Sequence, residues 1–125
     1  MKKITKTTKE IKTKVVDATG KTLGRLCTDV AMKLMGKDMA TFERNSYSGS
    51  QVNVINASKI NITPKKLESL EHLRYSGYRG GLRTTKASET VEKKGMRELV
   101  RLSVERMLPK NKLQREMMKH LTVTE

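Results

Sequence analysis

The chain has 125 residues, enough for one domain with a modest core, and that core must be aliphatic because the sequence holds one Phe and no Trp. Its 27 Lys and Arg against 13 Asp and Glu give a net charge of +14, which favours a polyanionic partner, nucleic acid first. No apolar run approaches the roughly 18 residues of a membrane-spanning helix, so an anionic membrane is the weaker candidate.

Lysine dominates the N-terminal segment, residues 1–14, which holds six Lys and one Glu. This composition predicts either a frayed, solvated terminus or, given the charge, a basic arm that becomes ordered on a polyanion. The segment lacks the hydrophobic stretch of a secretory signal, and the single Cys27 cannot form an internal disulfide, so a reducing cytoplasm is expected. Residues 15–125 are expected to form a single globular domain.

A strand, a turn and a helix are predicted after this arm. Residues 15–18 are rich in β-formers and end at a Thr-Gly turn, and Gly36 is placed to end the helix. The helix is predicted by apolar residues that recur at helical spacing, namely Leu23, Leu26, Cys27, Val30, Ala31, Leu34 and Met35. Its opposite face carries Lys21, Arg25 and Lys33.

The middle of the chain is predicted to contain a second strand. Residues 52–57 alternate in polarity and are rich in β-branched side chains, and residues 61–63 are compatible with a short extension before a turn at Pro64. The pattern of residues 67–75 fits either a strand or a helical turn, and both remain open.

The last third of the chain is predicted to be helical. A short helix is expected over residues 84–94, ending near Gly95, and a second apolar stripe runs over residues 96–108 until Pro109 stops it. Asn111 is placed to cap a last helix, in which Gln114 occupies the third position of a capping box. A strand–helix–strand start followed by helices predicts a small α/β domain around a mostly parallel sheet.

The tripeptide Gly20-Lys21-Thr22 has the ending of a phosphate-binding loop. That motif needs a glycine five residues earlier, where Val15 stands, so a nucleotide site is not expected. Lys21 and the start of the helix can still contact one phosphate of a larger polyanion.

The sequence contains no recognisable catalytic or metal-binding set. His72 and His120 have no Cys or His at metal-ligand spacing. Cys27 lies on an apolar stripe, where a buried, inert thiol is expected, and Asp17 is interpreted as a turn or capping group. The sequence thus predicts a protein that is not an enzyme and that uses no cofactor and no metal.

The segment "RYSGYRGGLR", residues 74–83, packs three arginines, three glycines and two tyrosines into ten residues. No Asp or Glu occurs from residue 72 to residue 88. Glycines permit close backbone approach, guanidinium groups bind phosphate, and tyrosines can stack on an unpaired base. A flexible, solvated hairpin tip is the alternative. We favour polyanion contact, through Arg74, Tyr75, Ser76, Gly77, Tyr78, Arg79, Gly80, Gly81 and Arg83.

A second basic segment is "RMLPKNKLQREMMKH", in which Pro109 fixes a corner between two helices. Five cationic residues oppose only Glu116, namely Arg106, Lys110, Lys112, Arg115 and Lys119. A solvated corner is possible, but two basic sites and a basic arm indicate a large ligand. The few aromatic residues argue against a single-strand stacking platform, and folded RNA fits better.

The order of several segments resembles the bacterial large-subunit ribosomal protein thirteen family. The segments are "VVDATGKTLGRLCTDVAMKLMGK", "VNVINASKI", "TPKKL", "RYSGYRGGLR" and "MLPKNKLQREMMKHLTV", and the similarity covers about residues 15–123. The resemblance implies a three-layer α/β/α domain, with a small, mostly parallel four-stranded sheet. It also implies a structural protein of the large ribosomal subunit that binds ribosomal RNA early in assembly.

By position, the family's basic and glycine residues fall on Lys21, Arg25, Lys37, Lys65, Lys66, Gly77, Gly80, Gly81, Lys110, Asn111, Lys112 and Arg115. The family loop usually has a proline where Arg79 stands, so this loop is more cationic and less stiff. The implied partners are large-subunit ribosomal RNA and neighbouring large-subunit proteins, with this chain a monomer in the cytoplasmic ribosome and with no membrane or small-molecule substrate. The alternatives are a general DNA- or RNA-binding protein outside the ribosome and an RNA-modifying enzyme.

Overall fold

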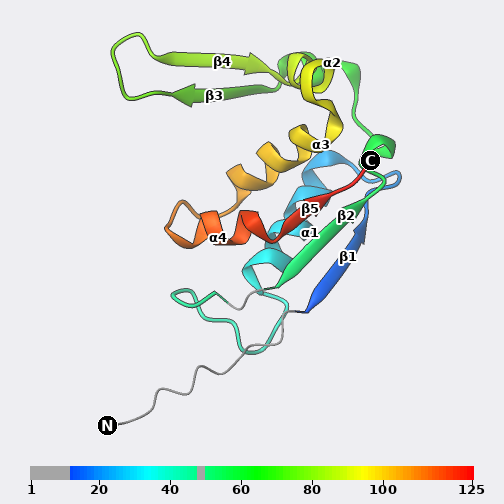
Figure 1. The fold of residues 1–125 in the computed structure, drawn as a ribbon. Coiled ribbons are helices and arrows are strands. Elements are labelled where there is room, and N and C mark those ends of the chain that lie inside the picture. The colour runs from blue at the N-terminus through cyan, green and yellow to red at the C-terminus, as the bar shows by residue number, and fades with distance from the viewer. Residues whose placement is uncertain (1–11, 48–49) are drawn as a thin grey trace.

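The computed structural model describes residues 12–47 and 50–125 as a mixed α/β domain (Figure 1). The elements follow the order β1 (Thr13–Asp17), α1 (Leu23–Met35), β2 (Gln51–Ile55), the 3-10 helix η1 (Ala57–Lys59), α2 (Pro64–Ser69), β3 (Glu71–Tyr75), β4 (Leu82–Lys86), α3 (Ala87–Met107), α4 (Leu113–Lys119) and β5 (Leu121–Val123). Strand β1 begins two residues before its predicted start, and it takes Thr13 and Lys14 from the predicted arm. The other arm residues that were predicted, 1–11, lie outside the described residues.

The parallel sheet of the described residues has three strands in the order β1-β2-β5, so the expectation of four strands is wrong for this part of the chain. The other two strands, β3 and β4, form a separate antiparallel hairpin. Buried parallel strands need nearly continuous apolar runs, whereas this hairpin carries Arg74, Arg83 and two threonines. Its composition is that of a solvated ribbon.

Helices cover one face of the sheet. The strand register places Val16, Val54 and Val123 on the same face, where all three are buried against the helices. On the opposite face, Val15 is 61% exposed and Ile55 is 37% exposed. The described residues therefore form two layers, and they supply no helix over this second face, where the three-layer expectation placed one.

Helix α1 has the predicted bounds and the predicted buried face. Its apolar stripe packs against α3, and Leu26, Val30 and Leu34 of α1 are completely buried, as is Leu99 of α3. Gly36 ends the helix with a left-handed φ of 77°, which is the conformation that favours glycine at this position. The Cys27 thiol is also fully buried, 4.0 Å from the Val100 carbonyl oxygen, and burial raises its pKa to about 12. The prediction of a buried, unreactive thiol is confirmed.

The boundary of α3 was predicted in part. Gly95 breaks the helix, with φ 81° and ψ 175°, as the sequence indicated. The predicted start at residue 84 is wrong, because Thr84 and Thr85 belong to β4, where they pair with Leu73 and His72. Both threonines are β-branched, which favours a strand when a partner strand is available. The turn expected at Pro64 is the start of the short helix α2, and residues 67–75, for which a strand and a helical turn were both open, divide between the end of this helix and strand β3.

The last helix, α4, is capped by Asn111, as predicted. The Asn111 Oδ1 accepts a hydrogen bond from the Gln114 backbone N–H at 3.1 Å. The Gln114 side chain does not return to the cap, because its Nε2 donates to the Glu105 carbonyl at 2.6 Å. The Asn111 half of the predicted capping box therefore forms, whereas the Gln114 side chain connects α4 to the end of α3. No helix of the described residues is long and apolar enough to cross a membrane.

Candidate nucleic-acid interface

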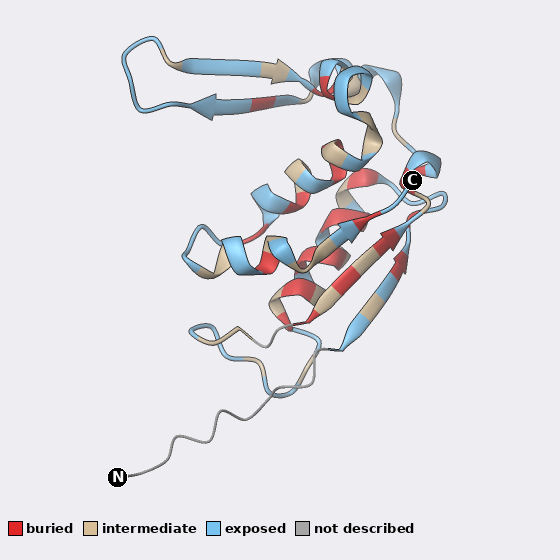
Figure 2. Cartoon of the chain, in the orientation of Figure 1, coloured by how far each residue is buried: buried red, intermediate tan, exposed pale blue. Residues whose placement is uncertain are grey.

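The β3–β4 hairpin projects from the body of the domain, and almost all of its residues are exposed (Figures 1 and 2). Two hydrogen bonds hold its base. The Ala87 N–H donates to the Leu70 carbonyl at 2.8 Å, and the Arg106 Nη1 donates to the Glu71 carbonyl at 3.0 Å. Arg106 was grouped with the second basic segment in the sequence, but this bond makes it an anchor for the hairpin.

His72 is the buried residue at this anchored base. Its side chain is 8% exposed, and both ring nitrogens lack a hydrogen-bond partner in the described part of the chain. Burial, followed by the nearby positive charge of Arg106, lowers the pKa of the imidazole. His72 therefore packs as a neutral side chain at neutral pH, which excludes it as a cationic contact for RNA.

The tip of the hairpin depends on its glycines. Gly77 and Gly80 have left-handed φ values of 88° and 71°, a region that most other residues avoid. The Gly81 N–H donates to the Tyr78 carbonyl at 3.0 Å, and a Cβ on Gly81 would lie 1.9 Å from the Ser76 Oγ. The glycines predicted from the motif thus have structural reasons to be glycine, and they set the path of the backbone between the arginines.

The strand register places two arginines directly opposite each other, Arg74 on β3 and Arg83 on β4. Like charges at such cross-strand positions repel and destabilise a hairpin. No carboxylate within residues 12–47 and 50–125 forms an ion pair with Arg74, Arg79 or Arg83. A phosphate bound between the two guanidinium groups would replace this repulsion by two charge-assisted contacts.

The two faces of the hairpin differ in chemistry. Alternation along the strands puts Leu73, Tyr75 and Leu82 on the face opposite Arg74 and Arg83. These three side chains are 58–64% exposed. The Tyr78 ring, at the tip, is 81% exposed and is free to stack on an unpaired base. The hairpin therefore presents one cationic face and one apolar face.

A second basic group lies at the carboxyl edge of the sheet. The Asn61 N–H donates to the Lys21 carbonyl at 3.0 Å, and the Gly20 N–H donates to the Lys59 carbonyl at 3.1 Å. These bonds bring exposed Lys21 beside exposed Lys59, which the sequence reasoning did not single out. The available signal was that Lys59 closely follows a predicted parallel strand, since the carboxyl ends of parallel strands meet at one edge.

Asp17 holds the turn that presents Lys21. Its Oδ1 accepts hydrogen bonds from the Thr19 N–H at 3.0 Å, the Thr19 hydroxyl at 2.8 Å and the Asn56 amide at 3.1 Å. These bonds, the Thr19 backbone bond first, lower the pKa of the carboxyl to about 2. The prediction that Asp17 is a turn residue is confirmed, and a carboxylate with so low a pKa is a poor general base.

The remaining predicted contact residues are exposed but are spread over the domain. Arg25 lies in the first turn of α1, and Lys65 and Lys66 lie on α2, which leads into the hairpin. Lys37 follows the far end of α1, a helix of 13 residues that is about 20 Å long at 1.5 Å per residue. A third group stands at the α3–α4 corner and comprises Lys110, Lys112 and Arg115. Asn111 at this corner uses its side-chain oxygen to cap α4.

The part of the chain that the structure describes offers no metal site. Among the described residues, no group of three or more His, Cys, Asp or Glu side chains is placed to hold a metal ion. Most of the basic residues instead gather in three separate places on the domain: the hairpin, the carboxyl edge of the sheet and the α3–α4 corner. Such a distribution suits a large, folded polyanion better than a small ligand.

Comparison with known proteins identifies the family. The sequence pattern of ribosomal protein L13 matches residues 11–125. The chain is 47% identical to the large ribosomal subunit protein uL13 of Aquifex aeolicus over 109 residues, which are 87% of this chain and 75% of that protein. It is 46% identical to uL13 of Thermotoga maritima over 87% of this chain and 72% of that protein, and 48% identical to uL13 of Lactobacillus johnsonii over 85% and 73%. The chain belongs to the ribosomal protein L13 family.

Proposed function

We propose that this protein is a structural constituent of the large ribosomal subunit, in the cytoplasm, and that it binds large-subunit ribosomal RNA early in assembly. The relatives are named as large-subunit proteins, which supports this placement and a structural rather than an enzymatic role. The observation that carries RNA binding is the facing pair Arg74 and Arg83, which repel each other on an exposed hairpin and lack a carboxylate partner in the described chain.

The three basic sites give the proposal its mechanism. Phosphate contacts at the hairpin, at the carboxyl edge of the sheet and at the α3–α4 corner neutralise different RNA segments. Because one domain carries all three, its contacts constrain the relative positions of those segments and respond to their shape rather than their sequence. The proposal assigns further phosphate contacts to the lysine-rich residues 1–14. One copy of the chain is sufficient for each subunit.

The salt dependence of RNA binding tests the proposal. Replacing Arg79 and Arg83 together by Ala should weaken binding to large-subunit ribosomal RNA and should flatten the plot of log affinity against log salt by roughly 0.9 units for each lost phosphate contact. Lys93→Ala is the control, since Lys93 lies on α3, outside the three sites, and pairs with Glu89. An unchanged slope for the double variant would show that the hairpin does not contact phosphate.

Competition separates this proposal from its rival, a general nucleic-acid-binding protein outside the ribosome. Unlabelled large-subunit RNA should displace the protein from labelled RNA far more effectively than duplex DNA at the same phosphate concentration. In cell extracts, the tagged protein should sediment with the large subunit and stay there after a high-salt wash. Equal competition by DNA, or a protein that remains at the top of the gradient, would favour the rival.

A further inference from the structure

Strand β5 lies at one edge of the described sheet, because it pairs with β2 and with no other described strand. The His120 carbonyl accepts the Val52 N–H at 3.0 Å, and the Thr124 N–H donates to the Val54 carbonyl at 2.9 Å. Peptide groups alternate in direction along a strand, so Leu121 and Val123 direct their N–H and C=O groups away from β2. This edge can accept another extended chain.

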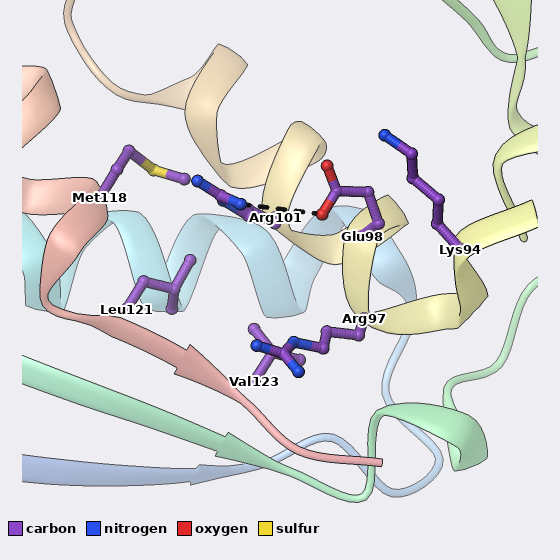
Figure 3. Close-up of a pocket in the computed structure, with 7 residues that line it drawn as sticks. All are labelled: Lys94, Arg97, Glu98, Arg101, Met118, Leu121 and Val123. Carbon is purple, nitrogen blue, oxygen red and sulfur yellow. Dashed lines mark ion pairs between the residues drawn. The ribbon is translucent and has the colours of Figure 1, made fainter.

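A groove runs beside this edge, between β5, α3 and α4. Its upper part is a hollow of about 340 Å³, in which Arg97 reaches toward Val123 and Arg101 toward Met118 (Figure 3). A second hollow of about 520 Å³ shares Arg101 and Met118 and continues along α4. We call the two hollows together the β5 groove.

The lining of the β5 groove is cationic at the rim and apolar at the base. In the upper hollow, Lys94, Arg97 and Arg101 face one carboxylate, Glu98, which lies 3.9 Å from the Arg101 guanidinium. The apolar part is formed by Met118, Leu121 and Val123. The lower hollow adds Arg115 and Lys119 against Glu105, so cations exceed carboxylates along the whole groove.

Beside the upper hollow, the chain's own Glu125 lies against Arg97, which is one of the lining residues. Its Oε1 accepts the Arg97 N–H at 3.4 Å, at the point where α3 resumes after Gly95. The first N–H groups of a helix segment carry a partial positive charge, which adds to the charge of the nearby Lys94 and Arg97. The groove therefore has the electrostatics to receive acidic side chains.

An extended acidic peptide can contact the free strand edge, the apolar side chains and the cations of this groove together, and RNA cannot. The peptide backbone would pair with the free edge of β5, alternate side chains would cover Met118 and Leu121, and the intervening acidic side chains would meet the cations of α3. Phosphates would meet the same cations, but they cannot extend a β-ladder, and they leave the apolar side chains of the groove uncovered. Charge and backbone chemistry thus favour protein at this surface.

We propose that the β5 groove is the docking site for an extended, acidic segment of a neighbouring protein, which adds to β5 as a further strand of the sheet. This inference rests on the proposed function, because the large subunit is what supplies the neighbour. It assigns different partners to different faces of the domain: RNA to the hairpin, the carboxyl edge and the corner, and protein to the β5 groove.

Site-specific photo-crosslinking in purified large subunits tests the inference. A benzophenone side chain replaces exposed Lys94 at the groove in one variant and Arg79 at the hairpin tip in another. The Lys94 position should give an adduct that survives ribonuclease and is lost to protease, and the Arg79 position should give an adduct with RNA. An RNA adduct, or no adduct, at position 94 overturns the groove proposal. No RNA adduct at position 79 counts against the proposed function instead.

Charge reversal supplies a matched pair of variants. Arg101 and Lys93 each pair with a glutamate on α3, but only Arg101 lines the groove. Arg101→Glu should lower the yield of the protein adduct at position 94 about tenfold, and Lys93→Glu should leave it unchanged. Thermal unfolding of both variants checks that they fold equally well. Equal yields from the two folded variants would contradict a charge-selective site.

Discussion

The α1–α3 interface and the β3–β4 hairpin follow opposite rules in the same chain. At the interface, Leu26 and Leu99 are completely buried and each packs against other apolar side chains. In the hairpin, two arginines face each other, and Leu73 and Leu82 are 58% and 60% exposed. The apolar side chains of the interface are covered by one another, whereas the arginines of the hairpin have no carboxylate partner within residues 12–47 and 50–125. This difference separates the part that maintains the fold from the part to which we assign RNA binding.

The largest expected difference between the two regions is in the cost of replacing a leucine by alanine. Leu99→Ala should destabilise the domain by about 2–5 kcal/mol, because it removes apolar contacts and leaves a cavity in a completely buried site. Leu82→Ala should change the free energy of unfolding by less than about 0.5 kcal/mol, because that side chain is exposed in the free protein. Urea denaturation of both variants measures the difference. Similar losses would mean that the hairpin is part of the core.

The backbone of the hairpin tip gives the next largest effect. A Cβ on Gly80 would meet no atom within 4 Å, so Gly80→Ala tests only the left-handed φ of 71°. That conformation costs a non-glycine residue about 1–2 kcal/mol, and RNA affinity should fall by roughly five- to thirtyfold as the bound loop shape becomes rarer. Filter binding to large-subunit RNA measures the loss.

Gly24→Ala is the matched control for this variant. Gly24 lies inside α1, and a Cβ there also meets no atom within 4 Å. The change should stabilise the domain by at most about 0.5–1 kcal/mol, the value for a helix interior, since Gly24 lies in the first turn of α1, and RNA affinity should not fall. If both alanines weakened binding equally, the loop conformation would not be the cause.

Replacing one arginine of the facing pair should leave the stability unchanged or slightly higher and should weaken RNA binding. Arg74→Ala relieves the repulsion from Arg83, so the free energy of unfolding should stay the same or rise slightly. RNA affinity should fall about fivefold at 0.15 M salt, the value expected for one lost phosphate contact. Denaturation and RNA titration on the same preparation give both numbers. A clear loss of stability would show that the pair does not repel in the free protein.

Lowering the pH should reduce the free energy of unfolding through His72 at the base of the hairpin, and this is the smallest of the expected effects. The folded-state pKa of His72 lies below its ordinary value of 6.5, so the unfolded chain binds more protons in the window below pH 6.5. The stability contributed by neutral His72 is therefore complete above pH 6.5 and is lost as the pH falls. Unfolding curves at pH 7.5 and 5.5 measure the change, and His72→Leu should reduce it. His120→Gln, the control at the second histidine, should retain it.

Local patterns were reliable where neighbours in sequence decide the structure. The apolar stripe predicted α1, and Gly36, Gly95 and Asn111 marked a helix end, a helix break and a helix cap. The glycine- and arginine-rich segment is exposed, as its composition indicated, and its role in binding remains a prediction. Each of these features depends on contacts within about four residues, so periodicity and capping chemistry are sufficient to find it.

The sequence by itself therefore determined the basic character of this protein, its main helices and the loop that carries the arginines. Only the tertiary structure decided that the described sheet has three strands, that Arg74 faces Arg83, that Arg106 anchors the hairpin, and that Lys59 lies beside Lys21. The physical reason is that strand register and edge position arise from packing between segments far apart in the chain. Composition can show that cations are abundant, but only that packing can place two of them opposite each other.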